Sequence, residues 1–253
     1  VARSLNSYID GYEYGADGLF YLNELWNSWD HHTRFSHVQQ ADALAGINES
    51  QRHAAQFIRK AGCVIITLGS AFQYYLTDGH RPVANNHRAP SQWFQKVLLS
   101  VAEITDALHH TIARLQEVNP DAQVLFTISP VRHIRDGVVD NNRSKARLIE
   151  AVHELCGRWG HVHYFPAYEL VIDVLRDYRY YDIDLVHPNY AATSFVWEHF
   201  VPACIDASAL PLMKQINDIT VARNHRTRFP DTDAHRRFLA TYLAKTQALA
   251  AQH

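Results

Sequence analysis

The chain has 253 residues, of which 47% are hydrophobic and 20% are charged, a composition typical of ordinary soluble globular proteins. Its 24 basic and 26 acidic side chains give a formal net charge of -2, so charge gives no reason to expect nucleic acid or an anionic membrane as partner. The 3 cysteines lie far apart and argue against a disulfide framework, and no apolar run reaches the length of a membrane span. With no signal-peptide pattern at its start, we predict a cytoplasmic location.

From residue 61 onward, apolar runs alternate with amphipathic stretches. We predict strands over residues 63–68, 123–128 and 162–165. We predict helices over residues 91–118, 144–159, 168–178 and 190–205, the first with Ser91 as its N-cap. Apolar strands separated by helices indicate parallel βαβ units with helices on both faces of the sheet.

The two ends of the chain are expected to be helical. The first sixty residues read as mostly helical, and so does the tail from about residue 209, with an interruption at 225–235. No linker rich in proline or glycine divides the sequence. We therefore predict a single α/β domain over residues 1–253.

The carboxyl ends of the predicted strands are where a ligand is expected to bind. Gly69 and Ser70 follow the first strand, and Ser129 follows the second. Ser70 directly follows a strand and a glycine, so the residues alone nominate it as a nucleophile. The alternative is that Ser70 is only a turn residue.

The sharpest local motif is "DIDLVHPN", residues 182–189, which places Asp184 three residues before His187. A serine esterase needs a histidine base and a carboxylate that fixes its tautomer, and this loop supplies both. The alternative is an aspartate that caps a turn beside a surface histidine.

A second motif, "TISPVRHIRDG", delivers Arg132 and His133 to the same sheet edge. Arg132 could pair with a substrate carboxylate or with the internal Asp136, and the internal pairing is favoured. A further segment, residues 175–182, is dense in Arg and Tyr and favours a structural network of cation–π contacts.

The loop "PVANNHRAP", residues 82–90, contains Asn85, Asn86 and His87, which could donate hydrogen bonds to an oxyanion. Loops of this composition are usually only connections. The 17 histidines suggest a metal site, with His31, His32 and His37 near Asp30 as ligands. The adjacent pair His31 and His32 would point to different faces, so we predict no metal and no cofactor.

Several segments together resemble one family. They are "VIITLGSAFQYY", "VANNHRAP", "FTISPVRHIRDGVVDNNRSKA", "YFPAYELVIDVLRDYRYYDIDLVHPN" and "HRTRFPDTDAHRRFL". Taken jointly, these long and ordered motifs resemble the GSCFA family, a bacterial group similar to the SGNH/GDSL hydrolases. The resemblance runs from about Trp26 to about Leu239.

The resemblance implies a flavodoxin-like, SGNH-type three-layer sandwich with a parallel sheet and helical additions at both ends. It implies that Asp184 and His187 are the last catalytic block. It also places Gly69 and Ser70 in the oxyanion region, where Ser70 stands for the usual threonine. On this interpretation Ser70 is an oxyanion or turn residue and not the nucleophile.

The sequence departs from the family pattern in three places. The family's Gly-Ser-Cys-Phe-Ala motif, expected to hold the nucleophile, does not occur, so Val1 is expected to begin downstream of it. Ala71-Phe72 replaces the Asn-Asp pair of typical relatives, and Asn86 stands where the family usually has cysteine. The sequence therefore has a base without its expected nucleophile.

Three hypotheses follow. The leading one is an SGNH-like serine esterase for an O-acyl group on a sugar or small metabolite, with His187 as base and Asp184 as its orienter. The second is a non-catalytic binding module in which self-association or a partner covers an exposed sheet edge. The third is a metal-dependent phosphoesterase that uses the histidine-rich segments.

Overall fold

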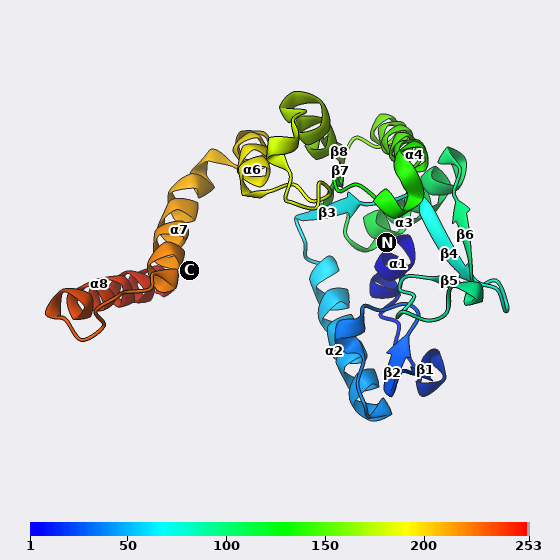
Figure 1. Cartoon of the computed structure of the whole chain (residues 1–253), viewed down its shortest axis with the longest axis horizontal. Coiled ribbons are helices and arrows are strands. Elements are labelled where there is room, and N and C mark those ends of the chain that lie inside the picture. Colours follow the sequence, from blue (N-terminus) through cyan, green and yellow to red (C-terminus); the bar gives the residue numbers. More distant parts are fainter. Residues whose placement is uncertain (252–253) are drawn as a thin grey trace. The chain divides into compact units, whose positions relative to one another are not determined.

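A computed structural model describes residues 1–251, and Figure 1 marks its elements. The strands are β1 (Leu19–Leu22), β2 (Leu25–Ser28), β3 (Cys63–Leu68), β4 (Phe72–Leu76), β5 (Pro82–Val83), β6 (Phe94–Leu98), β7 (Gln123–Ile128) and β8 (Val162–Phe165). The helices are α1 (Ala2–Asp10), α2 (Gln40–Ile58), α3 (Val101–Val118), α4 (Gly137–Arg158), α5 (Ala167–Glu169), α6 (Tyr190–Cys204), α7 (Leu210–Asn224) and α8 (Asp233–Ala250).

The central sheet is parallel, with the strand order β3-β7-β8. Cys63 lies opposite Gln123 at one end of the β3–β7 pair, and Leu68 lies opposite Ile128 at the other. The three strands predicted from the apolar runs are confirmed at their predicted bounds. The carboxyl ends of β3 and β7 are therefore level with each other, so the residues that follow them share one edge.

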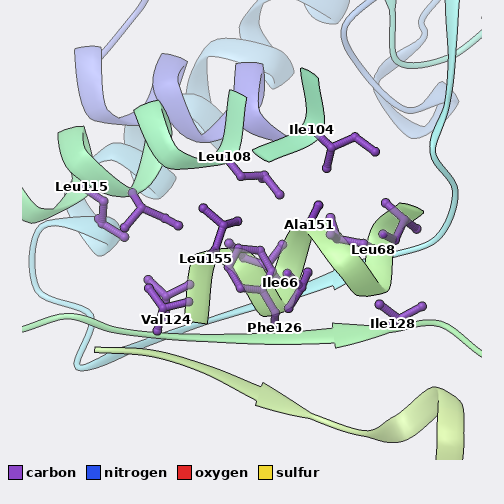
Figure 2. Packing of buried hydrophobic residues seen from close by; sticks show 14 of the residues in the cluster. Ile66, Leu68, Ile104, Leu108, Leu115, Val124, Phe126, Ile128, Ala151 and Leu155 are labelled. Carbon is purple, nitrogen blue, oxygen red and sulfur yellow. The ribbon is translucent and has the colours of Figure 1, made fainter. Parts of the chain in front are cut away.

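One face of this sheet packs against α3 and α4. Alternate residues of the strands point into the core, where they meet apolar side chains from both helices (Figure 2). The side chains labelled there are Ile66, Leu68, Ile104, Leu108, Leu115, Val124, Phe126, Ile128, Ala151 and Leu155. Fully burying a side chain such as Phe126 contributes roughly 1.5–3 kcal/mol, so this layer anchors the strand ends that carry the site.

The other face is covered unevenly. On β7, Leu125 is buried and α5 packs nearby, whereas on β3 Cys63 and Ile65 are exposed, Ile65 to 54%. Within residues 1–251, β3 pairs with β7 on one side only, so its other edge is unpaired. The α/β class with a parallel sheet is confirmed.

The predicted helix 91–118 is wrong in its first part. Residues Phe94–Leu98 form β6, which pairs antiparallel with β4, with Phe72 opposite Leu98. The helix begins at Val101, where Ser100 and Glu103 form a reciprocal capping box, so Ser91 is not its N-cap. The apolar residues of β6 matched a helical spacing by coincidence, and the capping box was the stronger signal.

Other boundaries also differ from the sequence-based expectation. Helix α4 begins at Gly137 and not near residue 144. The segment predicted as a helix from residue 168 is helical, as α5 continued by a π-helix over Leu170–Leu175, but it ends at Leu175 and not at residue 178. The first sixty residues contain a β-hairpin, β1–β2, between α1 and α2. Asn23 and Glu24 both have positive φ in its two-residue turn, which suits the twist of a tight hairpin.

Contacts divide the chain into two compact units, residues 1–193 and 194–253. The second unit contains α7 and α8, which confirm the helical tail and its interruption; Thr232 caps α8 by accepting a hydrogen bond from the His235 N–H. The prediction of one domain for residues 1–253 stays a prediction. The candidate site described below lies in the first unit.

Candidate functional site

Asp184 and His187 form a tight pair in the loop that precedes α6. His187 Nδ1 lies 2.6 Å from Asp184 Oδ2. The other carboxylate oxygen, Oδ1, accepts hydrogen bonds from the backbone N–H groups of Val186 at 2.9 Å and His187 at 3.0 Å. Leu185, with φ of 56°, makes the sharp turn between them. One oxygen thus closes the turn, while the other contacts the imidazole.

These hydrogen bonds set the charge of Asp184. The backbone N–H of His187, followed by its side chain and the Val186 N–H, lowers the pKa of Asp184 to about 2. The ionised carboxylate can only accept, so Nδ1 of His187 is the donor, and the tautomer that this contact selects carries its hydrogen on Nδ1 and has a bare Nε2. Within residues 1–251, Asp184 is the only side chain that hydrogen-bonds the His187 ring, and both side chains are exposed. Nε2 is therefore available to take a proton.

Further bonds hold the loop in place. The Asp182 N–H donates to the His187 carbonyl at 2.8 Å, and Tyr181 and Pro188 form an antiparallel bridge. Asn189 caps α6 by accepting from the Ala192 N–H at 3.2 Å. The Asp184–His187 pair is therefore anchored between a closed turn and a capped helix.

A second cluster lies where β3 and β7 end. The Lys145 Nζ donates to the carbonyls of Gly69 and Ser129, each at 2.6 Å. Ser144 Oγ accepts from the Ala71 N–H at 2.7 Å and lies 3.3 Å from Ser70 Oγ. Ser70 Oγ also accepts from the backbone N–H two residues on, at 3.1 Å. The Ser70 hydroxyl is therefore engaged in the turn that leaves β3.

Lys145 is the residue at this edge that sequence reasoning missed. It is 1% exposed, and burial lowers the pKa of its amine to about 8. The signal was available, because Lys145 shares one helical face with Leu148, Val152 and Leu155, which are all buried. Its two carbonyl acceptors are neutral, so its positive charge has no carboxylate partner among the described residues.

His133 reaches the same edge. Its Nε2 lies 3.8 Å from the position that a Cβ would take at Gly69, and its backbone N–H donates to Asn141 Oδ1 at 2.9 Å. Burial, followed by the positive charge of Lys145, lowers the pKa of His133. The structure thus brings Gly69, Ser70 and His133 together, as the sequence predicted for this edge.

Arg132 lies between this cluster and the histidine loop. Its backbone N–H donates to the Val186 carbonyl at 3.4 Å, and its guanidinium lies over the rings of Tyr178 and Tyr181. The cation–π network predicted for residues 175–182 is confirmed. The favoured pairing of Arg132 with Asp136 is wrong, because Asp136 forms its ion pair with Lys96 of β6, forty residues earlier in the chain.

The loop of residues 82–90 has a different setting. His87 is 6% exposed, its Nε2 lies 2.7 Å from the Ser28 carbonyl, and its backbone N–H donates to Asn85 Oδ1 at 2.9 Å. Its ring meets Phe20 edge-on. Asn86 closes the loop by accepting from the Ala89 N–H. These bonds hold the loop against β2, and none of them joins it to His187 within the described residues.

A cleft of about 1080 Å³ adjoins the Ser70 turn. It is lined by α1, by the start of β4 and by residues that include Ser70, Ala71 and Ala84. The cleft lining does not include Asp184 or His187. Ser70 therefore lies between an open cleft on one side and the Lys145 cluster on the other.

The histidines considered as metal ligands have other partners. Asp30 pairs with Arg3 and Arg81, and His31 Nδ1 lies 2.8 Å from Ser28 Oγ. Over residues 1–251, no group of three His, Cys, Asp or Glu side chains is placed to hold a metal ion. Over the same residues, no helix combines the length and the apolar character needed to cross a membrane.

Comparisons with known proteins identify two regions of the chain. A model of the GSCFA family matches residues 1–200. A model described as GSCFA domain protein, C-terminal domain, matches residues 216–253. No curated protein and no solved structure matches the chain. The first match covers the whole of the unit that carries the site, residues 1–193.

Proposed function

Because the chain belongs to the GSCFA family, we propose that it is a serine ester hydrolase of the SGNH type, with a flavodoxin-like sheet. Its substrate in this proposal is an O-acyl ester of a sugar or small metabolite. The observation that carries the proposal is the 2.6 Å contact between Asp184 and His187 Nδ1, which leaves Nε2 without a protein partner among the described residues. A histidine oriented in this way is the general base of serine esterases.

The chemistry assigned to this pair follows from its geometry. His187 Nε2 removes the proton of a serine hydroxyl as the oxygen attacks the ester carbonyl, and Asp184 stabilises the imidazolium that forms. Nε2 then returns the proton to the departing alcohol oxygen, which leaves an acyl-enzyme. Water, activated by the same nitrogen, releases the acid and restores the serine. Asp184 stays ionised throughout, because its pKa is held at about 2.

Ser70 is assigned to the oxyanion region and not to nucleophilic attack. Its hydroxyl accepts from the Phe72 N–H and contacts Ser144 Oγ, and within residues 1–251 no hydrogen bond links it to His187. Gly69 and Ser70 stand at the carboxyl end of β3, where backbone N–H groups can face a developing negative oxygen. Lys145 beneath them adds positive charge to the same edge.

One observation favours a non-catalytic interaction module instead. The outer edge of β3 is unpaired in the described structure, and Ile65 beside it is 54% exposed. Such an edge accepts a further strand from another segment or chain.

Steady-state hydrolysis of p-nitrophenyl acetate and of O-acetylated sugars by the natural full-length protein distinguishes the two functions. The proposal expects turnover that obeys saturation kinetics and is lost after serine-directed inactivation. A folded protein that hydrolyses none of these esters would favour the interaction module.

A further inference from the structure

Arg132 carries a positive charge that no carboxylate of the described residues neutralises, which bears on the charge of the substrate. Within residues 1–251, no aspartate or glutamate forms an ion pair with Arg132. Three carboxylates of the neighbouring segments have other partners: Asp136 pairs with Lys96, Asp177 pairs with Arg179, and Asp184 contacts His187. Arg132 is therefore a cation without a carboxylate partner, and its backbone is bonded to the loop that carries His187.

The position of Arg132 is fixed by aromatic side chains. Its guanidinium carbon lies 4.5 Å from the ring centroid of Tyr181 and 5.1 Å from that of Tyr178. A cation–π contact orients the group but accepts none of its N–H hydrogen bonds. Arg132 thus keeps donors in a defined place over these rings, and its backbone N–H donates to the carbonyl of Val186, the residue before His187, at 3.4 Å.

Tyr181 contributes a buried hydroxyl beside the same cation. The residue is 7% exposed, and its hydroxyl has no acceptor for its own proton among the described residues. Burial raises the pKa of Tyr181, and Arg132 opposes that effect through its charge and as a hydrogen-bond donor. A buried hydroxyl proton left without an acceptor is costly, by an amount comparable with a lost hydrogen bond. An oxyanion placed beside Arg132 would accept from both groups.

The rest of the sheet edge carries the same sign of charge. Lys145, buried and bonded only to the neutral carbonyls of Gly69 and Ser129, adds a second cation without a carboxylate partner. Its positive charge, after burial, contributes to the lowered pKa of His133, which the Asp136 carboxylate opposes. A negatively charged ligand group is therefore favoured at this edge by both cations.

We propose that Arg132, together with Tyr181, binds an anionic group of the substrate, a carboxylate or a phosphate, while the ester lies at His187. This inference rests on the proposed function for the position of the ester. The guanidinium fork suits either oxyanion, because its donors are spaced to bond two oxygens at once. The preferred substrate is then an ester that carries negative charge in its acyl or alcohol part.

Esterase kinetics of the natural full-length protein test the charge preference. The parent, Arg132→Gln and Arg132→Lys are compared on neutral p-nitrophenyl acetate and on mono-p-nitrophenyl succinate, which bears a carboxylate. We expect Arg132→Gln to lower kcat/KM for the succinate ester roughly 10- to 100-fold, the worth of hydrogen bonds to a charged group. The acetate ester should change less than about 3-fold, and Arg132→Lys should fall between, since lysine keeps the charge but loses the fork.

Arg179→Gln is the matched control. Arg179 lies in the same loop cluster and loses the same charge, but it already pairs with Asp177 at 2.8 Å. This control should leave the preference for the succinate ester unchanged. Equal losses on both esters in Arg132→Gln, or an equal shift in Arg179→Gln, would overturn the proposal while leaving the esterase assignment intact.

Binding measured without turnover separates this inference from the proposed function. Calorimetric titration of the parent with succinate and with inorganic phosphate should show binding of at least one, and Arg132→Gln should lose it. The anion that binds identifies carboxylate or phosphate as the group recognised. Binding lost in the variant of a protein with no esterase activity would support the anion site and reject the esterase. Absence of binding to both anions in the parent would reject the anion site.

Discussion

Two loops of this protein carry a histidine near asparagine, and the structure gives the two histidines opposite settings. In residues 182–189, His187 is exposed and its Nδ1 faces a carboxylate whose pKa is about 2. In residues 82–90, His87 is buried against the Ser28 carbonyl and among aromatic rings. The comparison teaches that two histidines in polar loops can have rings with different partners. The exposed ring next to a carboxylate is the one that the proposed function uses as a base, whereas the ring bonded to a carbonyl in an aromatic cluster is expected to act in packing.

The largest expected effect belongs to His187→Ala. We expect esterase activity on p-nitrophenyl acetate to fall by about 10⁴-fold or more with the fold intact, because the base accounts for most of the activation of the nucleophile. His163→Ala is the control, since His163 is also exposed but bonds Gln123 on the neighbouring strand. Near-normal turnover by His187→Ala would contradict the assignment of His187 as the base and leave no functional difference between it and His87.

Asp184→Asn should be severe but milder than His187→Ala, with a loss of up to about 10⁴-fold in kcat. The amide can present a donor to Nδ1 and so favour the wrong tautomer. The carboxylate has a pKa lowered to about 2, so its stabilising effect on the loop is present above the ordinary value of 3.8 and is lost only as pH falls toward 2. Asp184 should therefore stay ionised across the whole pH–rate profile. Activity equal to that of the parent would reduce Asp184 to a turn-capping residue.

His87→Ala should have the opposite effect: a loss of stability with little loss of activity. Removing a ring that is 6% exposed leaves a cavity and removes a hydrogen bond to the Ser28 carbonyl, which keeps only the His31 N–H as donor, with an expected loss of about 2–4 kcal/mol in the free energy of unfolding. The kcat of the folded variant should change less than about 2-fold, because among the described residues the ring bonds none of residues 182–189. A large loss of kcat without a loss of stability would instead make His87 an oxyanion donor.

The pH dependence of stability adds a check on the same residue. Burial lowers the pKa of His87 from its ordinary value of 6.5, so below that pH the unfolded chain binds the proton more readily than the folded one. The stability advantage of the parent over His87→Ala should therefore shrink as pH falls below about 6.5. Urea unfolding of both proteins at pH 7.5 and 5.5 measures the change, and an advantage that grows at acid pH would contradict the buried, neutral ring.

The smallest expected effect is that of Ser70→Thr. Threonine keeps the hydroxyl that contacts Ser144 Oγ and accepts from the Phe72 N–H, so kcat/KM should stay within about 3-fold of the parent. A nucleophilic serine would tolerate the added methyl poorly, because β-branching restricts χ1. Loss of most activity in Ser70→Thr would therefore support Ser70 as the nucleophile.

The features predicted correctly from the sequence are those that depend on residues close together in the chain. The strands at Cys63–Leu68, Gln123–Ile128 and Val162–Phe165 were found from their apolar runs, which a buried parallel sheet requires. The Asp184–His187 pair was found because its partners lie three residues apart and meet within one turn. The helix assigned to residues 91–118 failed because the pairing of Phe94–Leu98 with β4 depends on residues about twenty positions earlier.

Contacts distant in sequence account for the rest of the site. Asp136 pairs with Lys96, which lies forty residues earlier in the chain, and not with Arg132. Lys145 of α4 donates a hydrogen bond to the carbonyl of Gly69, which lies seventy-six residues earlier. Neither pairing has a signature in the spacing of residues. The burial of His87 likewise depends on β2 and its aromatic neighbours, which the composition of a polar loop does not reveal.

Labelling with a fluorophosphonate probe, followed by mass mapping of the modified residue, tests the central claim most directly. The claim is that Asp184 and His187 activate a serine, so the natural full-length protein should react at one serine other than Ser70. Labelling of the His187→Ala variant should be at least about 10³-fold slower, because the base is absent. Equal labelling rates in the two proteins, no serine adduct in the parent, or an adduct mapped to Ser70 would contradict the account.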